Sequence, residues 1–506
     1  MTALTLERLR REGQAFSEEI SREGYLAHAG HQPTADLQPI YDRHSAILGE
    51  GALDFTLDLF RSSAAASEER RSARYLLEWQ IETQAARDVV TLDEREVAWE
   101  SAAVIDVAGT RRIPYQRASI EIANTRHRAE RLAIDDARAL TAEADHAPLR
   151  LERVQREKGY IEELEIATTY IETFEAVTGI SLPGLGAQCA DFIATTQAMW
   201  DDTLPYFLRR TLHITPGEAT RADALALFRG KEFDAAFPAG DLEPSIRRNA
   251  AELGIDPFAG GRITFDLAER EGKDSRAFCA PVRVPEEVYL VLRPHGGVTD
   301  YTTLLHELGH ALHFAYADPH YPFEYRWLGD NSVTEGYAML FDHLMQDRRW
   351  LLRYTGLGKN NMGEFVRLAA FEELHFLRRY CAKLLYELDV YGGRTTWEAL
   401  PDLYVETLST ATGFRYRSAD AFIDLDPRFY SSRYLRAWQL QSILAHSLVS
   451  RFDEDWFRNP AAGPWIVENL LAEGQRETAT ELALRASGAE LSFDPLVRAI
   501  ERGLTA

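Results

Sequence analysis

Residues 301–317 read YTTLLHELGHALHFAYA, and this stretch decides both the fold and the site that we expect. Apolar residues recur in it at intervals of three and four, the spacing of one face of an α-helix. These positions are Leu304, Leu305, Leu308, Leu312 and Ala315. Thr299 or Asp300 can cap the start of such a helix, and Pro319 ends it. The pattern therefore predicts a helix over about 301–317.

His306, Glu307 and His310 spell H-E-L-G-H within this helix. Because residues four apart stack on one helix face, both imidazoles can point at one metal ion while Glu307 lies beside it. Two imidazoles leave room for one more protein ligand and a water, and a nearby carboxylate can take the proton of that water. The motif predicts one catalytic Zn²⁺ per chain, with Glu307 as general base. The alternative is that both histidines are ordinary buried residues of a half-apolar helix.

A third ligand is available on a second predicted helix, which begins near Asn331 or Ser332. Glu335 lies in its first turn, 25 residues after His310. Zinc sites of this class commonly use two histidines and one glutamate, so we expect Glu335 to complete the ligand set. In the competing interpretation, Ser332 and Glu335 form a capping box that serves only their own helix. Asp342, two turns later, is a candidate partner for the outer N–H of a ligand histidine.

Two further positions of the motif helix need an explanation. Gly309 lies mid-helix, where glycine costs about 1 kcal/mol relative to alanine, and a close approach to its backbone is one reason to tolerate it. His313 follows His310 by three residues, a spacing that favours packing or a substrate contact over metal ligation. We therefore name His313 a candidate substrate-binding residue.

The composition restricts the classes of protein to consider. The 506 residues suffice for two to four domains, and 45% of them are hydrophobic, ample for large cores. A formal net charge of -23 would repel nucleic acid and anionic membranes, so we expect neither as a partner. The charged N-terminal stretch and the lack of long apolar runs predict a cytoplasmic protein. The three widely spaced cysteines, without a C-x-x-C pair, fit a reducing compartment.

Helical periodicity runs through most of the chain. The segments that show it are 4–24, 37–48, 64–97, 118–145, 146–179, 185–212 and 364–391. Within residues 261–292, three short runs of strand-forming residues cover 262–266, 277–284 and 287–292. We predict a mainly α protein with a small sheet directly before the motif helix. The sheet either only supports that helix or also offers a free edge to which an extended peptide can add as a strand.

Residues 272–372 resemble the oligopeptidase F and thimet oligopeptidase family of zinc peptidases. The matching residues are Gly272-Lys273, Ala277-Phe278-Cys279, Val288–Leu292, Gly296-Gly297, Asp300, His306–His313, Glu335 and Arg367–Glu372. The resemblance implies an elongated, two-lobed, neurolysin-like helical fold with a deep central channel that admits short peptides. We accordingly divide the chain into an N-terminal helical lobe or lid, residues 1–195, and a catalytic zinc metallopeptidase domain, residues 196–506.

The same resemblance implies roles for single residues. The family's zinc ligands correspond to His306, His310 and Glu335, and its general base corresponds to Glu307. The family also has a tyrosine-rich segment whose hydroxyls stabilise the oxyanion, and Phe429–Tyr434, FYSSRY, is similar to it. Tyr434 is the best match for the catalytic tyrosine, and Tyr430 is a candidate substrate-binding residue. The alternative for both is a tyrosine packed on a helix face with its hydroxyl in water.

The chain departs from the family pattern just before these tyrosines. Relatives carry a histidine and several glycines there, whereas this chain reads DLDPR over 424–428 and has no histidine between His375 and His446. We therefore expect the substrate contacts of this segment to differ from those of the family.

These observations predict a zinc-dependent oligopeptidase, a metalloendopeptidase that hydrolyses internal bonds of short peptides. A zinc carboxypeptidase on a similar scaffold is the first alternative, and it would need a cation such as Arg433 or Arg436 to hold the terminal carboxylate. A non-catalytic peptide-binding helical protein is the second alternative, although all four residues of the metal motif are present. We expect short peptides as partners and a monomer or small homo-oligomer.

Overall fold

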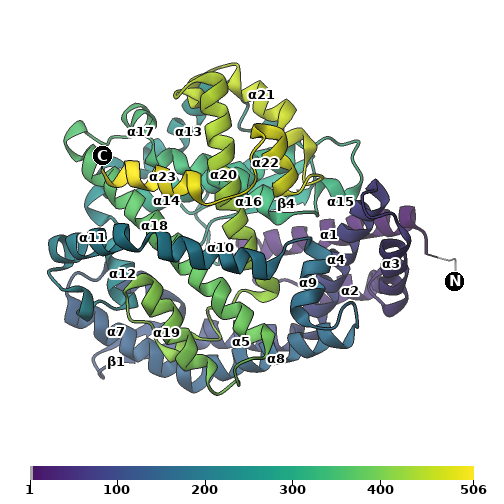
Figure 1. The fold of residues 1–506 in the computed structure, drawn as a ribbon, viewed down its shortest axis with the longest axis horizontal. Coiled ribbons are helices and arrows are strands. Elements are labelled where there is room, and N and C mark those ends of the chain that lie inside the picture. The colour runs from purple at the N-terminus through teal and green to yellow at the C-terminus, as the bar shows by residue number, and fades with distance from the viewer. Residues whose placement is uncertain (1–3, 506) are drawn as a thin grey trace. The chain divides into compact units, whose positions relative to one another are not determined.

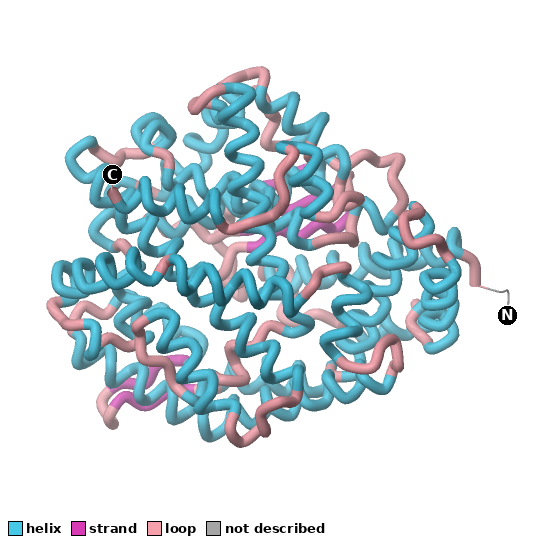
Figure 2. Tube along the Cα trace, in the orientation of Figure 1, coloured by secondary structure: helices cyan, strands magenta, loops and turns pink. Residues whose placement is uncertain are grey.

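The structure is a computed structural model that describes residues 4–505, and most of these residues are helical (Figure 1, Figure 2). The prediction of a mainly α fold is confirmed. The contacts between residues in space divide the chain into two compact units, each built from three separate segments. Unit 1 comprises residues 1–81, 232–363 and 436–496, and unit 2 comprises 82–231, 364–435 and 497–506. We expected a single boundary near residue 195, and the division into a lid and a catalytic domain stays a prediction.

Unit 1 holds the motif helix and the small sheet. Its helices are α1 Leu6–His28, α2 Gln38–Arg43, α3 Glu50–Ser62, α13 Ala239–Leu253, α14 Val298–Tyr316, α15 Phe323–Arg326, α16 Asn331–Asp342, α17 Arg348–Tyr354, α21 Ala462–Asn469 and α22 Ala479–Ser487, and its strands are β3 Ile263–Asp266, β4 Phe278–Arg283 and β5 Glu287–Val291. Four helices have residues in both units: α4 Glu68–Asp88, α18 Lys359–Gly392, α20 Tyr430–Phe452 and α23 Asp494–Leu504.

Unit 2 is helical apart from one hairpin. Its helices are α5 Val90–Ala102, α6 Ala118–Asn124, α7 Arg128–Thr141, α8 Ala147–Glu163, α9 Tyr170–Thr178, α10 Leu182–Thr195, α11 Gln197–Phe207, α12 Arg221–Phe228 and α19 Leu400–Thr412. The sequence analysis missed the hairpin of β1 Val104–Val107 and β2 Arg111–Pro114. Each strand has only four residues, and Ala108 and Gly109 turn the chain at positive φ, so the apolar alternation is too short to stand out.

The three predicted strands of unit 1 form one sheet in the order β3-β5-β4, with β3 parallel and β4 antiparallel to β5. Side chains alternate between the two faces of a strand. Ala280 and Val282 of β4 pack in one apolar cluster with Tyr25 of α1, whose ring stacks on Tyr289 of β5. Cys279 of β4 therefore lies on the opposite face, which is the face that α14 covers. The edge strands of the sheet are β3 and β4.

Helix α14 begins at Val298, three residues earlier than predicted. Its N-cap is Gly297, and Asp300 lies within the first turn, so the expected caps Thr299 and Asp300 are wrong by two to three residues. The Asp300 carboxylate instead accepts hydrogen bonds from the N–H groups of His295 and Gly296, at 2.6 and 2.7 Å. It thereby fixes the glycine turn that leads from the sheet into the helix.

Candidate metal centre

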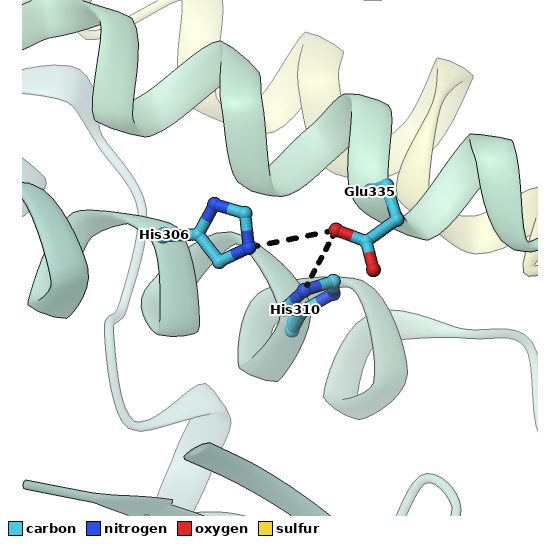
Figure 3. A group of neighbouring side chains, drawn as sticks. All are labelled: His306, His310 and Glu335. Carbon is cyan, nitrogen blue, oxygen red and sulfur yellow. Dashed lines mark ion pairs between the residues drawn. The ribbon is translucent and has the colours of Figure 1, made fainter. Parts of the chain in front are cut away.

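The three side chains predicted as metal ligands converge on one point between α14 and α16 (Figure 3). Oε2 of Glu335 lies 3.5 Å from Nε2 of His306 and 3.6 Å from Nε2 of His310. These separations are too long for hydrogen bonds. Two ligand atoms that each lie about 2.0–2.1 Å from one tetrahedral ion are about 3.3 Å apart, close to the spacing seen here. The three atoms therefore fit the ligand set of a zinc ion.

The outer nitrogens of both imidazoles have oxygen partners. Nδ1 of His306 lies 2.8 Å from Oδ2 of Asp342, and Nδ1 of His310 lies 2.8 Å from Oγ1 of Thr334. A proton on each Nδ1 donates to these oxygens and leaves both Nε2 atoms to bind a metal. Asp342 was a predicted partner. Thr334 was missed, because nothing in the sequence distinguishes it except that it precedes Glu335.

The charges around the site are strongly coupled. Burial disfavours protonation of His306, but the neighbouring carboxylates of Asp342 and Glu335 outweigh it and raise its pKa to about 10. Burial also opposes ionisation of Glu335, yet the nearby imidazoles of His306 and His310 hold its pKa well below the usual value. Without metal, the carboxylates thus attract a proton to His306. A bound cation would replace that positive charge.

Glu307 lies beside the ligand cluster and against the sheet. Its side chain is buried, and burial raises its pKa, an effect that the positive charge of His310 and His306 opposes. Its carboxylate faces the backbone N–H of Cys279 on β4. Burial raises the pKa of the Cys279 thiol well above the ordinary value, and the charge of Glu307 adds a smaller effect in the same direction. A carboxylate with a raised pKa is suited to accept a proton from a water bound at the metal site.

The structure also resolves the two interpretations of Ser332 and Glu335. The residue that caps α16 is Asp330, whose side chain accepts a hydrogen bond from the Ser332 N–H at 3.0 Å. Ser332 is therefore inside the helix, and the capping box is wrong. The Glu335 carboxylate turns toward the histidines rather than back to its own helix start (Figure 3).

Gly309 allows α14 and α16 to approach each other. A Cβ atom on Gly309 would lie 2.5 Å from Cα of Ala338 and 2.6 Å from the carbonyl oxygen of Tyr337. Such distances are far shorter than any van der Waals contact, so any larger residue would push α16 away. The mid-helix glycine therefore brings the helix that carries Glu335 within reach of the two histidines.

His313 does not face the metal cluster. Its side chain is 0% exposed and packs against the rings of Phe314 and Tyr337, at centroid distances of 5.1 and 5.0 Å. Burial lowers its pKa to about 3, so the ring is neutral at ordinary pH. Of the two roles expected for His313, the burial supports packing, and we correct the assignment to substrate binding.

The candidate tyrosines lie at the start of α20 within unit 2. Tyr434 packs edge-on against Tyr430 at a centroid distance of 5.1 Å and against Tyr380 at 5.5 Å. The metal centre belongs to unit 1. The catalytic role of Tyr434 and the substrate contact of Tyr430 therefore stay predictions.

The two arginines considered as carboxylate clamps differ in their surroundings. Arg433 is buried, with 4% of its surface exposed. Arg436 donates to Oγ1 of Thr480 at 3.0 Å and lies 3.7 Å from the carboxylate of Asp330, the residue that caps α16. Arg436 therefore already has a structural role at the base of the metal-centre helix.

A second group of potential ligands, Glu96, Glu100 and His146, occurs among the residues that the structure describes. Here Nε2 of His146 lies 2.7 Å from Oε1 of Glu96, which is a direct hydrogen bond. Arg150 donates to the other oxygen of Glu96 at 3.0 Å. The protein itself thus balances the charge of Glu96, and an ion-pair network explains this group.

Comparisons with known proteins give a family match and a similar fold. Residues 258–502 match the model of a family described as peptidase family M3. The crystal structure of the M32 carboxypeptidase from Deinococcus radiodurans R1 is similar over 99% of both chains, with a TM-score of 0.62 and 16% sequence identity. At that identity, the likeness shows a shared helical fold. No curated protein matches the chain. Within residues 4–505, no helix combines the length and apolar character that a membrane crossing requires.

Proposed function

We propose that the chain, whose residues 258–502 match the model of peptidase family M3, is a zinc endopeptidase that hydrolyses internal bonds of short peptides. The observation that carries the proposal is the convergence of His306, His310 and Glu335, with both outer imidazole nitrogens held by oxygen partners. This arrangement has the ligand spacing and the outer hydrogen bonds of a catalytic zinc site. We propose one Zn²⁺ per chain.

The residues around that site have separate tasks in hydrolysis. When bound, a zinc ion polarises a peptide carbonyl and lowers the pKa of a water toward neutrality. Glu307 takes the proton of the attacking water and then passes it to the leaving amine. Its buried position favours acceptance of the proton, because burial raises the pKa of its carboxyl. Tyr434 donates a hydrogen bond to the oxygen that becomes negative during attack.

The sheet offers a place for the substrate backbone. β4 is an edge strand, and its residue Cys279 faces Glu307. We propose that the peptide lies along the outer edge of β4 as an added strand, which aligns one of its carbonyls with the metal and the base. Main-chain hydrogen bonds give affinity without a strong side-chain preference, as an enzyme for varied short peptides requires.

The variant Glu307→Gln tests the assignment of the base. It keeps the size of the side chain but cannot accept a proton, so kcat should fall about 10²–10⁴-fold. Metal analysis of the purified variant should still give one zinc per chain, because Glu307 is not a ligand. Hydrolysis at the parent rate with zinc bound would show that another group is the base.

A carboxypeptidase is the second candidate, because the similar M32 structure is that of a carboxypeptidase. An internally quenched peptide blocked at both ends separates the two activities. An endopeptidase cleaves it and releases fluorescence, whereas a carboxypeptidase needs a free terminal carboxylate. Loss of single C-terminal residues from an unblocked peptide, without cleavage of the blocked one, would favour the second candidate.

The proposal also covers the setting in which the enzyme acts. Short peptides are the partners that the family's activity implies, and we keep the expectations of a cytoplasmic location and of a monomer or small homo-oligomer. Light scattering on the purified protein measures the oligomeric state. We propose that residues 1–195 act as a lid over the catalytic residues 196–506.

A further inference from the structure

The segment that departs from the family pattern, residues 424–429, is tied to α18 by buried polar side chains. The N–H of Asp426 donates to Oε1 of Glu387 at 3.0 Å, and Oδ2 of Asp426 lies 2.8 Å from Nζ of Lys383. Glu387 and Lys383 lie one helical turn apart on α18 and are 0% and 4% exposed. Because buried polar groups are costly unless they are hydrogen-bonded, these contacts specify one position of the segment relative to α18.

A second pair of contacts holds the beginning of the segment. Oδ2 of Asp424 accepts a hydrogen bond from the hydroxyl of Tyr404 at 2.8 Å, and Oδ1 accepts one from Arg379 of α18. The charge of Arg379 and Lys383 outweighs the effect of burial and lowers the pKa of Asp424 to about 2. Asp424 is therefore a full negative charge between two helices, α18 and α19.

The end of the segment has an unusual backbone. Arg428 and Phe429 have φ values of 60° and 55°, in the left-handed region that residues with side chains rarely adopt. The N–H of Arg428 donates to the hydroxyl of Tyr170 at 3.1 Å, and its guanidinium lies 3.2 Å from Oε2 of Glu157. Such a conformation costs about 1–3 kcal/mol per residue and persists only where the surroundings enforce it. Here α8 and α9 enforce it.

Glu387 also reaches the helix that follows the segment. While one of its oxygens accepts from the Asp426 N–H, the other accepts from the hydroxyl of Ser431 in the first turn of α20. Ser431 is completely buried. One carboxylate on α18 therefore bridges the segment and the helix start, and it fixes where α20 begins.

The same part of α18 contacts Tyr434 through a ring. Tyr380 packs edge-on against Tyr434, and Nζ of Lys383 lies 5.4 Å from the centroid of the Tyr380 ring. A cation over a ring face is attracted to it. The group that pairs with Asp426 thus also supports the ring on which Tyr434 rests.

We propose that Glu387 and Lys383 are positioning residues that set the place of the Tyr434 hydroxyl. The buried carboxylate locks the first turn of α20, and the ammonium group locks the ring beside Tyr434. In this chain, contacts with buried polar side chains hold in place a segment for which relatives use glycines. The inference rests on the proposed oxyanion role of Tyr434, and the experiment below separates the two.

The first comparison is between Glu387→Ala and Glu387→Gln. The alanine variant loses both contacts of the carboxylate, whereas the amide of E387Q can still accept from the Asp426 N–H and donate to Ser431. Misplacement of a catalytic group by about 1 Å can cost 10²-fold, so we expect kcat of E387A to fall about 10–100-fold with KM nearly unchanged. E387Q should retain kcat within about threefold of the parent. Equal losses in both variants would overturn the inference.

A double-mutant cycle then tests whether Glu387 acts through Tyr434. In a Tyr434→Phe background the positioned hydroxyl is absent, so E387A should lower kcat by less than about twofold. The same 10–100-fold loss in both backgrounds would mean that Glu387 acts elsewhere. Parent activity of Y434F alone would instead refute the oxyanion role of Tyr434, and the positioning role would fall with it.

A measurement without turnover completes the test. Amide hydrogen exchange of the zinc-loaded full-length protein should be faster over residues 424–434 in E387A and unchanged in Y434F. If E387A does not fold, Ser431→Ala replaces it in the test, because it removes only one of the two contacts of Glu387. S431A should show a smaller loss in kcat and faster exchange in the same segment. The matched control is Ser447→Ala, which removes a hydroxyl that binds the Ala486 carbonyl near the far end of α20. S447A should match the parent in both measurements, and unchanged exchange in both E387A and S431A would contradict the inference.

Discussion

The metal centre of unit 1 and the tyrosine segment of unit 2 reach their geometries by different routes. In the metal centre, two predicted ligands and the base lie within five consecutive residues of one helix, and the third ligand follows 25 residues later. In the tyrosine segment, Asp426 depends on Glu387, 39 positions away, and Arg428 on Glu157, 271 positions away. Local helix geometry thus builds most of the first site, whereas distant charged partners build the second. Changes in the two regions should therefore have separable effects.

The largest effect is expected when a metal ligand is removed. His310→Ala takes away one of three proposed ligands, so zinc content should fall from one ion per chain to a small fraction and peptide hydrolysis to background. Metal analysis and a fluorescent peptide assay measure both. Chelation of the parent enzyme should give the same loss, and added Zn²⁺ should restore activity to the parent but not to H310A. Full zinc content in H310A would contradict the assignment of His310 as a zinc ligand.

The second effect is expected at the tyrosine segment, on chemistry without loss of metal. Tyr434→Phe removes one hydrogen-bond donor to the developing oxyanion, worth about 2–4 kcal/mol, so kcat should fall about 10²–10³-fold. Zinc content should equal that of the parent. Tyr430→Phe, a neighbour on the same helix turn, is the matched control and should affect KM more than kcat. A loss of zinc in Y434F would show that the two regions are not separable.

The third effect concerns the outer partners of the ligand histidines. Asp342→Asn keeps the shape of the side chain but weakens the contact with Nδ1 of His306, so zinc should bind about 10–100-fold more weakly. Competition with a calibrated chelator measures this affinity. Thr334→Val removes the corresponding neutral partner of His310, and the loss should be smaller because a hydroxyl carries no charge. An equal loss in both variants would contradict the electrostatic part of this explanation.

The smallest effect is expected on stability. Gly309→Ala introduces a methyl group that would meet the backbone of α16, so the free energy of unfolding should fall by about 1–3 kcal/mol. Denaturant unfolding measures it. Gly24→Ala in α1 is the control, since no atom lies within 4 Å of the added Cβ, and helix propensity predicts a gain of about 0.5–1 kcal/mol. A neutral G309A variant would mean that α14 and α16 can separate without cost.

The helical periodicity of apolar residues, together with the positions of proline and glycine, predicted most of the fold. The helix of the motif, the helix that begins at Asn331 and the three strands before them all occur within a few residues of their predicted bounds. The β1–β2 hairpin was missed, because four-residue strands give too little alternation. The capping residue of α14 was also assigned incorrectly, and the capping box considered as an alternative for α16 does not form. A cap depends on where the chain turns, and residues outside the helix decide that.

Sequence alone determined which side chains share a helix face, because residues four apart must stack once a helix forms. It therefore brought His306 and His310 together and set Glu307 beside them. Tertiary structure decided that Glu335 meets the histidines, that Thr334 holds His310, and that His313 is buried. It also decided that residues 424–428 contact side chains of α18, α19 and α9. These outcomes depend on how closely distant helices approach and on which buried charges find partners, and neither is encoded in a local pattern of residues.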